Sequence, residues 1–167
     1  ADAMELFSSP RRVTGSARGI ASVHDSGGER ALFVDRAHDL GVPFAAITEA
    51  TLATLDDTLD PGLEAANPLD AWGTGIDADR IFHESFLALH DDPDTAAMVF
   101  VGDLTRQGEP YDEGYLQVAK DVWEATSKPF CVLSNLASAV AIEEAAYLRD
   151  LGIPVLEGTS SGLVALR

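Results

Sequence analysis

The stretch RGIASVHDSGGERALFVDRAHDLG, residues 18–41, decides the fold of this chain. Its apolar run predicts a buried strand over 19–24, and Gly27 and Gly28 then favour a turn. Apolar residues recur after the turn at intervals of three and four, the spacing of one helix face: Phe33, Ala37 and Leu40. The sequence therefore predicts a strand, a glycine turn and a helix over 28–40 in direct succession.

The glycine turn is a candidate anion site. Such a turn ahead of a helix directs backbone N–H groups outward, and the helix dipole favours an anion there by about 0.3–2 kcal/mol. The same residues also fit a capping box, in which Ser26 caps the helix and the Glu29 side chain reaches back to the N–H of Ser26. A capping box needs no ligand, so these residues alone leave both interpretations open.

Composition narrows the class of protein. The 167 residues suffice for one compact domain, and the net charge of −17 disfavours nucleic acid and anionic membranes as partners. No apolar run reaches the 18 residues of a membrane span, and the amino end lacks the pattern of a secretory signal, so we expect a cytoplasmic protein. The acidic segment 90–94, HDDPD, lacks the glycine and distal glutamate of a calcium loop, and we interpret it as a solvated loop.

The rest of the chain alternates between strand and helix patterns. Four further strands are predicted, at 43–47, 96–102, 129–135 and 153–156. Helices are predicted between them, at 48–59, 78–90, 111–126, 138–151 and 160–166. Continuous apolar strands separated by helices indicate an α/β fold: a three-layer, doubly wound parallel sheet of five strands in the flavodoxin-like order 2-1-3-4-5. We assign 18–167 to this domain and 1–17 to a helical stub and linker from a preceding domain.

Polar residues gather where predicted strands end. In such sheets ligands bind beyond the carboxyl ends of the strands, near the switch between strands 1 and 3. That edge would collect three segments, 24–28, 103–106 and 134–135. The irregular loop at 60–77 is longer than most loops in compact domains, and its part 66–75 could fold over the same edge.

Two motifs resemble a known family. HDSGGERALFVDRA, residues 24–37, and ANPLDAWGTG, residues 66–75, are similar to elements of the nucleoside-diphosphate-forming acyl-CoA synthetases, relatives of succinyl-CoA synthetase. The family's corresponding elements are a strand-Asn-Ser-Gly-Gly-helix unit and an Ala-Asn-Pro-Val-Asp-Leu-Thr-Gly loop. The resemblance runs from Arg18 to the end of the chain, which would be the carboxy-terminal flavodoxin-like domain.

The resemblance implies a phosphoryl-transfer role. In that family an acid, CoA and a nucleoside triphosphate react through an acyl phosphate and a phosphohistidine on a mobile loop, whose phosphate lies between two helix amino termini. The helix from Gly28 would be one of these. The resemblance implies that phosphate is bound by Ser26, Gly27 and Gly28. It implies a substrate-binding role, in part of a carboxylic acid pocket, for Asp25, Arg30, Asn67, Asp70 and Gly73.

Two residues, Asp25 and Glu29, depart from the family pattern. The capping role of Glu29 would occupy one N–H that is otherwise free for phosphate. Asp25 stands where the family usually has Asn, and a second anion close to a phosphate is repelled. Asp25 must therefore point away, be protonated or be neutralised. Arg30, in place of a small residue, is the nearest candidate to pair with Asp25, and it could instead pair with the acyl phosphate. We hypothesise that an Asp25–Arg30 pair adapts the site to a different acid.

The resemblance also implies missing partners. No histidine of this chain has the His-Thr-Gly context of the family's phosphohistidine, so we expect no catalytic residue and no metal site here. The partners would be a CoA-binding domain and a nucleotide-grasp domain, on the same chain or on a partner subunit. The full enzyme would use CoA, ATP or GTP, and Mg; this domain alone would bind no cofactor and would be inactive.

Three other interpretations remain. A response-regulator receiver would use acidic residues such as Asp25 and Asp103, but the sequence EGTSSG after the fifth strand lacks the lysine that its chemistry needs. A flavodoxin would need aromatic residues flanking a flavin, and Trp72 and Trp123 are not suitably placed. A noncatalytic flavodoxin-like module for binding or protein association is the main alternative.

Overall fold

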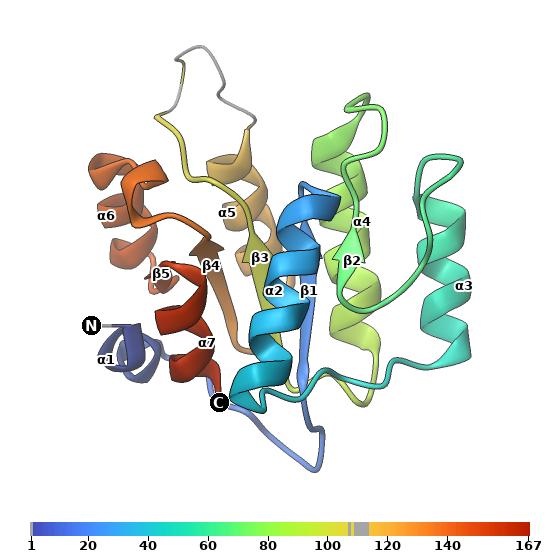
Figure 1. Cartoon of the computed structure of the whole chain (residues 1–167), viewed down its shortest axis with the longest axis horizontal. Coiled ribbons are helices and arrows are strands. Elements are labelled where there is room, and N and C mark those ends of the chain that lie inside the picture. Colours follow the sequence, from blue (N-terminus) through green and yellow to red (C-terminus); the bar gives the residue numbers. More distant parts are fainter. Residues whose placement is uncertain (1, 107, 109–113) are drawn as a thin grey trace.

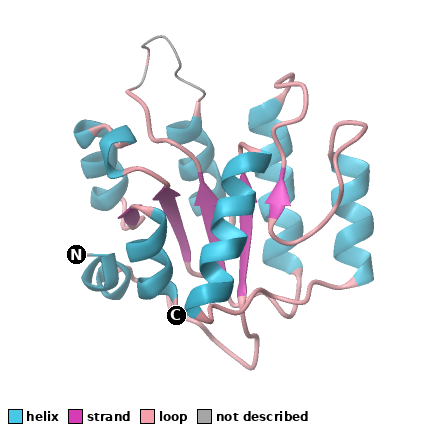
Figure 2. Cartoon of the chain, in the orientation of Figure 1, coloured by secondary structure: helices cyan, strands magenta, loops and turns pink. Residues whose placement is uncertain are grey.

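The computed structural model describes residues 2–106, 108 and 114–167, which form a three-layer α/β fold (Figures 1 and 2). All strand pairs are parallel, and the sheet order is β2-β1-β3-β4-β5. The strands are β1 Ile20–His24, β2 Leu69–Asp70, β3 Ala97–Val101, β4 Phe130–Ser134 and β5 Val155–Glu157. The predicted fold class and strand order are confirmed.

Helices cover both faces of the sheet. One face carries α1 Asp2–Ser8, α2 Gly27–Leu40 and α7 Thr159–Leu166. The other face carries α3 Glu49–Thr58, α4 Ala78–Asp91, α5 Tyr115–Ala125 and α6 Ile142–Asp150. A short 3₁₀ turn, η1 Ala137–Ala139, precedes α6. No described helix is long and apolar enough to cross a membrane.

The helix layers bury two separate apolar clusters against the sheet. Side chains alternate across each strand, so Val99 of β3 faces α2 and α7 whereas Phe100 faces α4 and α5. Phe100 packs edge-on against Phe86 of α4 and Tyr115 of α5, with ring centroids 5.7 and 5.2 Å apart. Strands buried on both faces explain the continuous apolar runs in the sequence.

The predicted strand at 43–47 is wrong. Only Phe44 of that segment forms a bridge, to Ile20, and β2 lies instead within the predicted loop. Both segments lie on the same edge of β1, and the Asn67 side chain fills the space between them. Its amide donates to the carbonyl groups of Ile20 and Ala45 at 2.9 and 3.0 Å, and its oxygen accepts from the N–H of Ser22 at 3.0 Å.

Two helix predictions need new bounds. The segment predicted as a helix over 138–151 forms η1 and then α6, because the backbone at Val140 and Ala141 is extended. The helix predicted over 111–126 is described from Tyr115 onward, and residues 111–113 lie outside the described residues.

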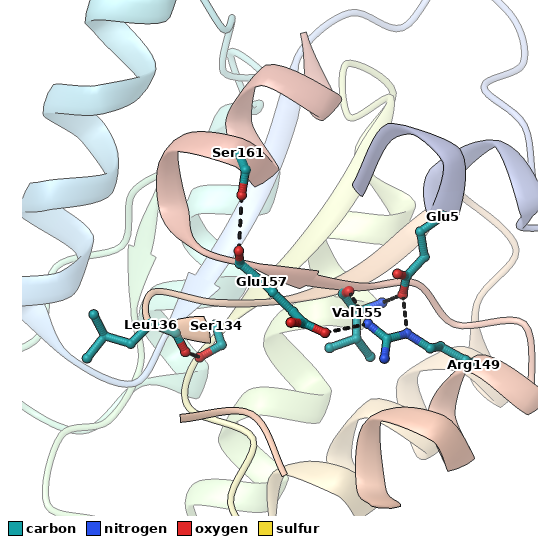
Figure 3. A network of polar contacts seen from close by, with 7 residues as sticks. All are labelled: Glu5, Ser134, Leu136, Arg149, Val155, Glu157 and Ser161. Atoms are coloured by element: carbon teal, nitrogen blue, oxygen red, sulfur yellow. Dashed lines mark hydrogen bonds and ion pairs between the residues drawn. The ribbon is translucent and has the colours of Figure 1, made fainter. Parts of the chain in front are cut away.

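The amino-terminal helix is attached to the main sheet. Arg149 of α6 forms ion pairs with Glu5 of α1 at 2.7 Å and with Glu157 of β5 at 2.9 Å (Figure 3). The same Glu5 carboxylate accepts from the N–H of Val155, and Leu6 packs against the apolar cluster under α2 and α7. Helix α1 thus packs on this domain; its origin in a preceding domain stays a prediction.

Candidate functional site

The start of α2 lies at the carboxyl edge of the sheet, directly after β1. Ser26 is the N-cap residue, with extended backbone, and its Oγ accepts from the N–H of Glu29 at 3.5 Å. The N–H groups of Gly27 and Gly28 donate to no other described residue. The structure therefore brings the three predicted phosphate-binding residues together, with two unpaired N–H donors at the positive end of a 14-residue helix.

Glu29 does not complete the predicted capping box. Its Oε2 accepts from Nδ2 of Asn135, after β4, at 2.7 Å, and Oδ1 of Asn135 accepts from the Thr159 hydroxyl at 2.6 Å. The Glu29 side chain thus links the first turn of α2 to the first residue of α7. Only the Ser26 half of the box forms.

Asp25 lies among acidic neighbours. Burial raises the pKa of its carboxyl to about 7; the hydrogen bond from Tyr115 acts in the opposite direction, while Glu29 and Asp103 add to the rise. Its Oδ1 is buried and has no hydrogen-bond partner among the described residues. With a pKa of about 7, about half of the Asp25 carboxyl groups are protonated at neutral pH.

The hypothesised Asp25–Arg30 pair is wrong. Nε of Arg30 donates instead to the carbonyl oxygen of Pro68 at 2.6 Å, so the guanidinium joins α2 to the segment that leads into β2. No ion pair between Asp25 and Arg30 occurs among the described side chains. The physical reason is position: Asp25 turns toward Tyr115, whereas Arg30 points toward Pro68.

Asp70 ends β2 beside the start of α2. A Cβ atom added to Gly27 would lie 2.8 Å from Oδ2 of Asp70, which is closer than real Cβ contacts allow. Oδ1 of Asp70 accepts from the N–H of Trp72 at 3.4 Å. Gly27 is therefore the residue that lets this carboxylate approach the helix, and the structure brings the predicted substrate residue Asp70 to the predicted phosphate site.

The other two predicted substrate residues, Asn67 and Gly73, lie against the backbone beside β1 and against the Asp60 side chain. Asn67 directs its amide at the backbone beside β1, as described above. Gly73 adopts φ 53°, and a Cβ there would lie 2.5 Å from Oδ2 of Asp60. Asp60 in turn accepts from the N–H and hydroxyl of Thr74 at 2.8 and 2.7 Å, which holds this loop together.

His24 is a buried residue of the core. Nε2 lies 2.9 Å from the Ser22 hydroxyl, and the ring packs edge-on against Phe33 with centroids 4.9 Å apart. Burial, followed by the charge of Arg30, lowers its pKa to about 3. His24 is therefore neutral at physiological pH. Across the described residues, no three His, Cys, Asp or Glu side chains are placed to hold a metal ion.

The sequence did not single out two residues of this edge. Thr159 and Tyr115 contribute side chains from the first residues of α7 and α5, whereas Asn135 belongs to the segment 134–135 that was predicted to reach this edge. A signal existed for Thr159, since it comes shortly after a predicted strand. No local pattern connected Tyr115 to Asp25.

The fold matches solved structures at 22% sequence identity. For the protein PH0766 from Pyrococcus horikoshii OT3, the TM-score is 0.71 over 99% of this chain and 38% of that one. For the dinucleotide forming acetyl-coenzyme A synthetase 1 from Ca. Korarchaeum cryptofilum, the TM-score is 0.73 for the apo form and 0.74 for the complex with phosphate and ADP. Those two matches cover 99% of this chain and 36% and 35% of the synthetase.

Comparison by sequence adds nothing to this result, because neither family models nor curated protein sequences match the chain. The chain spans between 35% and 38% of the length of the solved structures described above. It therefore has the fold of a segment of these longer proteins, an acetyl-coenzyme A synthetase among them.

Proposed function

We propose that this chain is a domain of a nucleoside-diphosphate-forming acid–CoA ligase, and that it holds the phosphoryl group of a phosphohistidine or an acyl phosphate at the start of α2. The observation that carries the proposal is the pair of unpaired N–H groups on Gly27 and Gly28. The fold shared with an acetyl-coenzyme A synthetase, which is known in complex with phosphate and ADP, supports it.

The chemistry of this helix start suits a phosphoryl group. Hydrogen bonds to a charged group contribute about 1.5–3 kcal/mol each, and the helix dipole adds about 0.3–2 kcal/mol. Ser26 keeps its hydroxyl at the N-cap, so Gly27 and Gly28 remain available to the ligand. Fixed N–H donors of this kind also stabilise charge that develops during phosphoryl transfer.

The acid substrate would bind beside the phosphoryl group. Asp70 lies next to Gly27, and the loop through Gly73 continues from it. In this proposal Asp70 orients the reacting groups, Arg30 fixes the position of Pro68, and Asn67 and Gly73 shape the loop. CoA, ATP or GTP, and Mg would be bound by a CoA-binding domain and a nucleotide-grasp domain, which are the proposed partners.

The test is phosphotransfer in a reconstituted system. The chain is mixed with the cognate CoA-binding and nucleotide-grasp domains, radiolabelled ATP, acid and CoA, and acyl-CoA formation is measured. Gly28→Pro removes one N–H in the first helical turn, where proline is tolerated, and should lower the rate at least tenfold. Gly28→Ala is the matched control, because it keeps the N–H and its Cβ would meet only Oγ of Ser26, at 3.7 Å.

A noncatalytic binding module is the second candidate. The observation that favours it is the number of carboxyl groups around the start of α2, namely Asp25, Glu29 and Asp70. The same reconstitution separates the two candidates. If a phosphohistidine forms and discharges to acyl-CoA equally well without this chain, the ligase proposal fails and the module remains.

A further inference from the structure

Two arginines at the amino ends of the strands have no partner within the described part of the chain. The protein has eleven basic residues, and all except Arg18 and Arg167 contact a group of the chain, such as a carboxylate, a backbone oxygen or an aromatic ring. Arg18 lies two positions before β1, and Arg167 directly follows α7 (Figure 1). Both therefore lie at the edge of the sheet opposite to the start of α2.

These two arginines line the same cavity, which has a volume of about 460 Å³ and is called the outer cavity below. The other residues that line it are apolar, Val13, Ile20 and Leu166 among them. No described acidic side chain lines it, although the chain has 28 acidic residues. Because neither guanidinium is bound to a carboxylate of the protein, both are available to an anion from outside.

A second cavity, of about 200 Å³, adjoins the outer one and is called the inner cavity below. It lies between α1 and the amino ends of β3 and β4, and Val13, Ile20, Ala97 and Leu166 line both cavities. The inner cavity extends to the fully buried side chain of Met98. Since an apolar cavity of about 150 Å³ can bind benzene, this one has room for an aliphatic chain of roughly six carbons.

The side chains of Ser9 and Arg11, which also line the inner cavity, are already hydrogen-bonded within the chain. The Ser9 hydroxyl donates to the carbonyl oxygen of Gly152 at 3.3 Å. Arg11 donates to the Thr126 hydroxyl and to the carbonyl oxygen of Lys128, both at 3.1 Å. A charged head group would lose its hydration in the inner cavity without compensation, so the outer cavity is the place for it.

We infer that the two cavities form one binding site for an aliphatic carboxylate of medium chain length. The carboxylate binds Arg18 and Arg167 in the outer cavity, and the chain occupies the inner cavity. A guanidinium can hold a carboxylate through two parallel hydrogen bonds, and burial of the chain removes apolar surface from water. The site lies at the opposite edge of the sheet from the proposed phosphoryl site and does not depend on it.

Calorimetric titration with octanoate tests the site, at about 0.15 M salt, where a screening length of about 8 Å limits the influence of remote acidic residues. The affinity should rise by up to about fourfold for each CH₂ group between butanoate and octanoate. Arg18→Ala and Arg167→Ala should each weaken octanoate binding by about three- to tenfold. Both side chains are exposed and unpaired among the described residues, so these variants should fold normally.

Arg36→Ala is the matched control, because Arg36 is an exposed arginine that lines neither cavity. This variant should bind octanoate as the unmodified chain does. Octylammonium, with the same chain and the opposite charge, should bind the unmodified chain at least about tenfold more weakly than octanoate. Equal binding of the two would mean adsorption to the protein surface and would overturn the inference.

A methyl resonance gives the location of the bound chain. The protein has two methionines: Met98 lines the inner cavity, whereas Met4 of α1 is 78% exposed and does not. In protein with labelled methionine methyl groups, saturation with octanoate should shift the Met98 resonance and leave that of Met4 in place. If acetate binds as tightly as octanoate and the Met98 resonance does not move, the inner cavity is unused and the inference fails. It also fails if octanoate does not bind and an acidic, apolar peptide does.

Discussion

The Asp92 carboxylate joins two helices of this fold through hydrogen bonds. It lies in the acidic segment that the sequence predicted as a solvated loop, yet it is 1% exposed, so that prediction is wrong for this residue. Its Oδ2 accepts from the N–H and hydroxyl of Thr48, at 2.8 and 3.1 Å, and from the Thr51 hydroxyl at 2.6 Å. The end of α4 is thereby joined to the start of α3.

Asp92→Ala should lower the free energy of unfolding at pH 7 by about 3 kcal/mol, because the N–H of Thr48 and the Thr51 hydroxyl lose a charged acceptor. Burial raises the pKa of Asp92, but the hydrogen bonds from Thr51, Thr48 and Asp94 outweigh it and the pKa is lowered. The stabilisation is therefore present above the unfolded-state pKa of about 3.9 and is lost as pH falls through the lower folded-state pKa.

Urea unfolding of the unmodified protein and of Asp92→Ala, at pH 7 and at pH 3, measures the difference in their free energies of unfolding. This difference should be smaller at pH 3. Asp94→Ala is the matched control, because the Asp94 side chain is exposed in the same segment. A loss of stability in Asp94→Ala as large as that in Asp92→Ala would contradict the role assigned to Asp92.

The edge of the sheet that contains β2 depends on the side chain of Asn67. Asn67 supplies hydrogen bonds between the Phe44 bridge and β2, where no strand backbone is present. Asn67→Ala would leave the N–H of Ser22 and the carbonyl of Ala45 without that partner, and we expect a loss of about 2–3 kcal/mol in the free energy of unfolding.

The control for this prediction is Glu64→Ala, since Glu64 is exposed in the same segment and forms no described hydrogen bond. Hydrogen exchange of the Ser22 amide gives a local readout, and it should accelerate in Asn67→Ala alone. Unchanged protection of that amide would show that the backbone holds this edge without the side chain.

The same edge explains what the sequence could and could not predict. The order of the strands and the α2 unit follow from local apolar spacing and from Gly27 and Gly28, so the fold was accessible from the sequence. Segment 43–47 resembles a strand because it is apolar. Strand β2 has only two residues, which is too short for a pattern of alternating apolar residues. Its position depends on Asn67, whose partners are distant in sequence.

The predicted site was incomplete for a similar reason. The residues proposed to bind phosphate are adjacent in sequence, and the resemblance to a family motif suggested them. Glu29 and Asn135 lie 106 positions apart, and the link from Asn135 to Thr159 depends on how β4 and α7 meet at the sheet edge. Such contacts arise from tertiary packing, which no local pattern encodes.

The whole molecule carries a large excess of acidic residues, 28 against 11 basic ones, with a net charge of −17. Repulsion among these charges is strongest in the compact state and weaker in the expanded unfolded chain. At 0.1 M salt the screening length is about 10 Å, and at 1 M it is about 3 Å, so added salt should relieve this repulsion. Salt should therefore stabilise the folded protein.

We expect the thermal unfolding midpoint at pH 7.5 to rise by about 5 °C or more between 0.02 and 0.5 M NaCl, with most of the rise below 0.2 M. The control is the same titration at pH 4.5, close to the isoelectric point of about 4.3, where the net charge is small and the rise should disappear. Equal increases at both pH values would mean that salt acts through hydration of the surface and not through the acidic charge. A midpoint independent of salt at pH 7.5 would mean that repulsion is as strong in the unfolded chain as in the folded one.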